Sequence, residues 1–122
     1  MCFTIRDERD YSALIVKDAV FIRHQAQAFK NLVRELAKKG KNNIILDMSG
    51  CEYISSEGLG AVAETWHGSR ERGGLFCVVC QNKAENEIRY LFDIIGFSVL
   101  LQGFIFDTLD DAIARVTNRP PA

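Results

Sequence analysis

The sequence has no long apolar segment and no excess of charge of one sign. No stretch approaches the roughly 20 consecutive apolar residues that a membrane-spanning helix needs, so we expect no membrane span. The first eight residues lack a basic region followed by an apolar one, and we therefore predict no signal peptide and a cytoplasmic protein. The formal net charge is −1 and no segment forms a strong basic patch, which argues against nucleic acid as a partner.

Several catalytic signatures are absent as well. The chain contains no Gly-x-Ser-x-Gly motif, no phosphate-binding loop and no dinucleotide-binding glycine pattern. We therefore expect neither an enzyme nor a bound cofactor. One enzymatic alternative remains, a small thiol enzyme in which Cys51 is a nucleophile of low pKa paired with His67, although no third group to orient the pair is evident.

The four cysteines do not form a metal-binding pattern. Cys77 and Cys80 have the spacing of a Cys-x-x-Cys pair, but the chain has no second Cys/His pair at metal-binding spacing. The apolar segment 75–80 that contains them is typical of a buried strand, in which residues three apart point to opposite faces. We therefore predict reduced, buried thiols and no metal site.

Apolar periodicity predicts alternating strands and helices in one domain. Short apolar or alternating runs predict strands at 2–8, 12–16, 42–46, 75–80 and 100–105. Helical spacing predicts helices at 24–39, 56–71, 82–95 and 108–116. Asn82 and Glu85 resemble a capping box for the third helix, and Asp107 or Thr108 caps the fourth.

The order of these elements predicts an α/β fold. Two adjacent strands pair antiparallel, and each later strand–helix–strand step is a right-handed crossover. We expect a mostly parallel five-stranded sheet with an antiparallel N-terminal edge strand and four helices. The domain should span residues 1–117, with 118–122 as a disordered C-terminal tail.

The most informative segment is 44–60, in which a buried strand and a loop lead into the second helix. Leu59, Val62 and Trp66 lie on the apolar face of that helix, so Ser56 lies at its start. Backbone amides are unpaired there and the helix dipole is positive. A phosphate on Ser56 would be held by the helix and would change the surface that a partner meets.

The loop 53–60, together with the order of elements, resembles the STAS domain, the fold shared by bacterial anti-sigma-factor antagonists and the cytoplasmic tails of sulfate transporters. Segments 72–74, 89–97 and 105–112 also match, so the resemblance covers nearly the whole chain.

This resemblance implies a function for the loop. In antagonist members the serine at the position of Ser56 is phosphorylated by a partner that is both an anti-sigma factor and a serine kinase. The unphosphorylated form binds that partner, and a serine phosphatase restores it. The resemblance therefore implies Ser56 as phosphoacceptor, and we expect the residues that contact the partner to be Phe21, Tyr53, Ser55, Glu57, Gly58 and Leu59.

The chain departs from the family pattern at two places. Ser55 stands where many members have Asp, and segment 19–22, which ends in Ile22, lacks the acidic residues of the family. We expect Val20 and Phe21 to be exposed there. Three alternatives remain: Ser56 is only a helix cap, Ser55 is the phosphoacceptor, or the chain is an unphosphorylated adaptor subunit of a transporter ATPase or a signalling scaffold.

Overall fold

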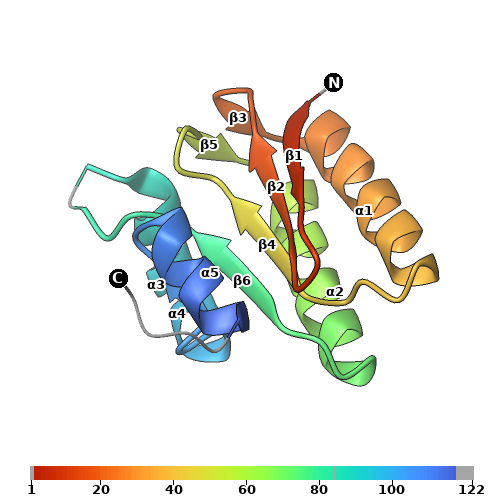
Figure 1. Ribbon diagram of the computed structural model, residues 1–122. Coiled ribbons are helices and arrows are strands. Elements are labelled where there is room, and N and C mark those ends of the chain that lie inside the picture. Colours follow the sequence, from red (N-terminus) through yellow and green to blue (C-terminus); the bar gives the residue numbers. More distant parts are fainter. Residues whose placement is uncertain (1, 84, 118–122) are drawn as a thin grey trace.

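Five short strands form the central sheet of the computed structural model, which describes residues 2–83 and 85–117. Their order across the sheet is β1-β2-β4-β6-β7, as Figure 1 shows for most of the sheet. β1 pairs antiparallel with β2, and every other neighbouring pair is parallel. The strands are β1 (Phe3–Asp7), β2 (Ser12–Val16), β4 (Ile44–Asp47), β6 (Phe76–Val79) and β7 (Ile105–Phe106).

Helices cover both faces of this sheet (Figure 1). Residues of α1, α2 and α3 share one large apolar core with the strands, and residues of α5 form a second core on the opposite face. β4 and β6 are buried along their whole length because both faces are covered. The helices are α1 (Arg23–Lys38), α2 (Ser56–Glu71), α3 (Glu87–Ile95), α4 (Phe97–Leu100) and α5 (Leu109–Thr117).

The predicted fold class is confirmed, with one helix more than expected. The four predicted helices correspond to α1, α2, α3 and α5, whereas α4 is a single turn that contains Leu100, which we had assigned to the last strand. Gly96 adopts a positive φ of 87° and separates α3 from α4. The predicted tail 118–122 lies outside the described residues.

Two predicted details of the caps are resolved by the structure. The cap of α3 is Asn86, whose side chain accepts a hydrogen bond from the Arg89 amide, so the predicted capping box at Asn82 is wrong. The Asn82 amide instead donates to Asp107 at 3.0 Å, which ties the end of β6 to the end of β7. Thr108 accepts from the Asp111 amide at 3.1 Å and caps α5.

The predicted burial of Cys77 and Cys80 is confirmed. Cys77 and Cys80 are buried and free, and they belong to the two different cores on opposite faces of the sheet. None of the helices within residues 2–83 and 85–117 is both long and apolar enough to cross a bilayer.

Candidate functional site

A second, two-stranded sheet fixes the start of α2. β3 (Val20–Phe21) pairs in parallel with β5 (Tyr53–Ile54), just outside the main sheet (Figure 1). The Ser55 amide also donates to the Phe21 carbonyl at 3.2 Å, so the pairing continues to the residue before the helix. Because β3 leads into α1 and β5 leads into α2, this small sheet joins the N-terminal ends of both helices.

Ser55 caps α2. Its backbone is extended, with φ −91° and ψ 175°, and its hydroxyl oxygen accepts a hydrogen bond from the Gly58 amide at 3.2 Å. The alternative that Ser56 is the helix cap is therefore wrong, because that position belongs to its neighbour.

Ser56 is the first residue of α2 and is exposed. No side chain or backbone group of the described residues forms a hydrogen bond with its hydroxyl. The hydroxyl is therefore directed to solvent at the positive end of a 16-residue helix.

Glu57 is also exposed, and its carboxylate interacts with the helix start. A hydrogen bond from its own backbone amide lowers the pKa of Glu57 most, followed by one from the Ser55 hydroxyl, while the Arg23 charge adds a smaller contribution. A negative charge is therefore already held beside Ser56.

Gly58 is required by packing inside the molecule. A Cβ atom at this position would lie 2.4 Å from the Phe21 carbonyl oxygen and 2.7 Å from Cγ1 of Ile54. The sequence predicted Gly58 as a partner contact, but the close neighbours of this glycine are the chain's own β3 and β5. Only glycine lets α2 approach the two-stranded sheet so closely.

Phe21 is fully buried, so the expected exposure of its side chain is wrong. Its ring packs edge-on against Phe29 of α1, with 5.8 Å between ring centroids. The alternation of a strand turns Phe21 into the core and leaves Val20 half-buried at the surface. The Phe21 side chain is thus a core residue and is not available to a partner.

The remaining predicted contact residues divide between surface and core. Tyr53 is 56% exposed, whereas Leu59 is half-buried and packs against the main core. The structure thus brings the exposed groups of Tyr53, Ser56 and Glu57 together around the start of α2, with Ser55 partly accessible between them.

One polar brace was not recognised from the sequence. Gln25 is buried near the start of α1, where its side chain accepts from the Ile22 amide at 3.2 Å and donates to Asp18 at 2.9 Å. The Asp18 carbonyl in turn accepts a weak hydrogen bond from the Cys51 thiol at 3.6 Å. The brace links the segments that precede β3 and β5; its only sequence signal is a Gln at the third helical position.

The structure does not support a thiol enzyme. Burial raises the pKa of Cys51 to about 12, and the nearby Cys80 and Asp47 act in the same direction. A reactive thiol needs a lowered pKa, so the predicted low-pKa nucleophile is contradicted. His67 is exposed on α2, and the described part of the chain contains no cluster of three metal-binding side chains.

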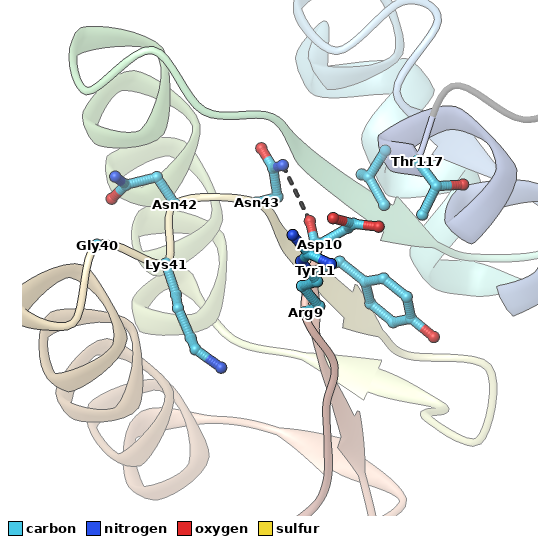
Figure 2. Close-up of a pocket in the computed structure, with 9 residues that line it drawn as sticks. Arg9, Asp10, Tyr11, Gly40, Lys41, Asn42, Asn43 and Thr117 are labelled. Atoms are coloured by element: carbon cyan, nitrogen blue, oxygen red, sulfur yellow. Dashed lines mark hydrogen bonds between the residues drawn. The ribbon is translucent and has the colours of Figure 1, made fainter.

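A polar hollow lies at the opposite end of the main sheet, where β2 and β4 begin (Figure 2). It is formed by the β1–β2 turn, the α1–β4 loop and the end of α5, and has a volume of about 370 Å³. The Asn43 side chain donates to the Asp10 carbonyl at 3.0 Å and accepts from the Leu75 amide at 3.0 Å. Lys41 pairs with Asp7 at 2.6 Å. These contacts hold the loops together, and they do not indicate a ligand for the hollow.

The comparison with known families agrees with this architecture. The STAS domain model matches residues 14–112, from β2 to α5. The chain belongs to the STAS domain family. Within this STAS domain, Ser56 occupies the exposed start of α2 described above.

Solved structures show the same fold. A candidate anti-sigma factor antagonist from Thermotoga maritima is 25% identical, with 94% of each chain covered and a TM-score of 0.75. An anti-sigma factor antagonist from Mycobacterium paratuberculosis is 23% identical, with 94% of this chain and 92% of that chain covered and a TM-score of 0.75. The Bacillus cell fate determinant SpoIIAA in its phosphorylated form is 18% identical, with 93% and 98% covered and a TM-score of 0.69. No curated protein sequence matches this STAS domain.

Proposed function

We propose that this STAS domain is a partner-switching regulator of bacterial transcription, an antagonist of an anti-sigma factor whose binding is controlled by phosphorylation of Ser56. The partner is an anti-sigma factor that is also a serine kinase, and a serine phosphatase reverses the modification. Such a regulator acts in the cytoplasm, where sigma factors act.

The observation that carries the proposal is the free hydroxyl of Ser56. Ser55 supplies the helix cap, and among residues 2–83 and 85–117 Ser56 has no side-chain hydrogen bond that phosphorylation would break. SpoIIAA, which shares the fold, has been solved in a phosphorylated form, so a domain of this shape accommodates the modification. The proposal favours Ser56 over Ser55 as phosphoacceptor, because the Ser55 hydroxyl is engaged inside the cap.

Electrostatics indicate how the phosphate would act. It adds a charge of about −1.5 to −2 next to Glu57, whose carboxylate already interacts with the amide at the helix start. The phosphate cannot take that place without displacing Glu57, so its charge faces the solvent or the partner. A partner surface that fits the neutral hydroxyl would then meet an added bulky dianion, which disfavours binding without refolding the domain.

An exposed apolar surface favours a protein partner. Most of the large exposed apolar side chains within the described residues lie on α3 and α4: Tyr90, Ile94, Ile95, Val99 and Leu100. α3 also packs against β5, which carries the exposed Tyr53 and leads to Ser56. Protein interfaces need such an apolar centre with a polar rim, and this surface would supply it next to the switch.

The test measures phosphorylation and binding together. The wild-type domain and its Ser56→Ala variant are incubated with ATP and the kinase copurified from native cells, and modified sites are mapped by mass spectrometry. We expect phosphate on Ser56 in the wild type and none in the variant. The affinity of the purified kinase should be at least about tenfold lower for Ser56→Asp than for Ser56→Ala.

Ser55→Asp is the matched control, because it adds the same charge one residue earlier at a position where Asp is a good helix cap. Equal phosphorylation of Ser56→Ala and wild type, or equal kinase binding by Ser56→Asp and Ser56→Ala, would contradict the proposal. Unchanged partner binding in Ser56→Asp would instead favour the adaptor alternative.

A further inference from the structure

A second hollow lies along the outer seam between α1 and α2. It has a volume of about 300 Å³ and is bordered by residues 30–38 of α1, by residues 64–68 of α2 and by Arg72 just after α2. Arg72 follows Ser56 by 16 residues, which corresponds to about 24 Å along a helix. The hollow is therefore separate from the candidate phosphorylation site, although α2 contributes to both.

The floor of this hollow is apolar and made of small side chains. Val33 and Ala37 contribute from α1, and Thr65 and Gly68 contribute from α2. Gly68 leaves the floor open because it has no side chain. The three atoms nearest to a Cβ atom there would all belong to the end of the Arg72 side chain, with Nη1 at 3.2 Å. Internal packing therefore does not require glycine at this position, unlike at Gly58.

The rim of the hollow is strongly cationic. Its border contains four cationic residues and one carboxylate: Lys30, Arg34, Lys38, Arg72 and Glu64. The whole chain, in contrast, has a net charge of −1.

Lysines and arginines of the rim differ in their partners. Lys30 pairs with Glu64 at 3.6 Å, and Lys38 pairs with Glu35 at 3.2 Å. The two arginines form no ion pair within residues 2–83 and 85–117. Arg34 donates to the Asn31 amide oxygen at 3.4 Å, and Arg72 donates to that of Asn42 at 2.9 Å. Each arginine thus keeps its charge uncompensated and retains guanidinium donors that can bind carboxylates.

The helix dipoles explain only part of this charge. α1 and α2 both end near the hollow, and cations such as Lys38 and Arg72 complement the negative ends of the helices. Lys30 lies two turns before the end of α1, beyond the range of that effect. The dipoles also do not account for an apolar floor beneath a cationic rim.

We propose that this hollow binds an acidic amphipathic helix of a protein partner. The carboxylates of that helix would pair with Arg34 and Arg72, and its small apolar side chains would lie on the floor between α1 and α2. Arginine suits this role because its planar guanidinium binds a carboxylate through two hydrogen bonds. The contact lies outside the surface controlled by Ser56, so binding here is independent of phosphorylation.

The test uses a labelled peptide of about 18 residues in which Leu and Ala form one helical stripe and Glu fills the other positions. We expect binding to the intact domain with a Kd below about 1 mM, and weakening with added salt. The same peptide with Gln in place of Glu should bind at least about tenfold more weakly. The double variant Arg34→Glu/Arg72→Glu should lose at least about tenfold in affinity.

Gly68→Leu provides a second variant that fills the floor without changing charge. Its affinity for the peptide should fall about as much as that of Arg34→Glu/Arg72→Glu. Its circular dichroism spectrum and melting behaviour should remain those of a folded domain. The matched control Lys17→Glu/Lys83→Glu carries the same change of net charge at exposed sites elsewhere. That control and Ser56→Asp should each change the affinity less than about twofold.

Four outcomes would overturn the inference. The first is no detectable binding of the peptide, and the second is an equal loss in the control double variant, which would indicate non-specific attraction. The third is a loss in Ser56→Asp. In the fourth, the domain binds anionic phospholipid vesicles or duplex DNA through Arg34 and Arg72 but does not bind the peptide.

Discussion

The two ends of helix α2 differ in how tightly they are held. At its start, Gly58 lies against the backbone of β3, and Ser55 closes the first turn with a hydrogen bond. Near its end, Gly68 faces an open hollow, and its nearest side-chain neighbour is the flexible end of Arg72. The same residue type therefore has a packing role at one end and leaves a surface open at the other.

The difference indicates how one helix serves two surfaces. Under the proposed function, the rigid helix start would present Ser56 to its kinase in one fixed position. Under the proposed binding of an acidic helix, the hollow would use the space that Gly68 leaves open and the guanidinium groups at its rim. Substitutions at the two ends should therefore have opposite effects on stability.

Gly58→Ala should have the largest effect. The added Cβ would overlap the Phe21 carbonyl oxygen, so α2 must move away from the two-stranded sheet. We expect the free energy of unfolding to fall by about 2 kcal/mol or more, as measured by urea denaturation. Gly60→Ala in the same helix is the control: its Cβ would meet nothing within 4 Å, so it should stabilise by up to about 1 kcal/mol. Equal effects of the two substitutions would contradict the packing role of Gly58.

Ser55→Ala should have the next largest effect. It removes the acceptor of the Gly58 amide and should lower the free energy of unfolding by about 1 kcal/mol. Ser56→Ala removes a hydroxyl without a partner in the described chain, so it should change stability by less than about 0.5 kcal/mol. Urea denaturation of both variants measures these two changes in stability. A larger loss of stability in Ser56→Ala than in Ser55→Ala would contradict the assignment of Ser55 as the helix cap.

Gly68→Ala should stabilise the domain. The end of the Arg72 side chain can move away from the new methyl group, so the higher helix propensity of Ala should dominate. We expect the free energy of unfolding to rise by about 0.5 to 1 kcal/mol. A decrease measured by urea denaturation would show that the open end of α2 is as tightly packed as its start.

The ion pair between Asp7 and Lys41 should give the smallest effect. It joins the end of β1 to the α1–β4 loop, near the open end of α2, and both side chains are about a third or more exposed. Hydrogen bonds from Lys41 and then Ser12 lower the pKa of Asp7. The stabilisation is therefore present above the ordinary pKa of about 3.9 and is lost as the pH falls through the lower folded value.

Solvent screening limits this contribution to a few tenths of a kcal/mol. Lys41→Met should remove the part of the pH dependence that arises from this pair, as measured by urea denaturation at pH values above and below the Asp7 transition. An unchanged pH profile in Lys41→Met would show that the pair does not contribute.

The main elements of the fold could be predicted from the sequence because each helix shows apolar periodicity and the buried strands form continuous apolar runs. β2 and α2 agree with their predicted bounds, and the buried segment around Cys77 was recognised as a strand. β3 and β5 could not be predicted, because each has only two residues and no periodicity can appear. Their pairing depends on contacts between segments that are distant in the sequence.

The same limit explains the errors at the site. The start of α2 was predicted correctly, but two adjacent serines were equally good candidates for its cap. Phe21 was expected at the surface because the pairing of β3 with β5, which turns its ring inward, was not visible in the sequence. The sequence around Gly58 does not show whether the close neighbour of this glycine belongs to the same chain or to a partner.

The edge strand β1 has a consequence for how other proteins can approach this domain. It pairs with β2 alone, and its last four residues are exposed, among them the charged Arg6 and Asp7. Charged side chains on an edge disfavour the addition of a strand from another chain. The opposite edge, β7, has only two residues and offers too few backbone groups to template a long pairing. Extension of the main sheet by a strand from another protein is thus disfavoured at both of its edges.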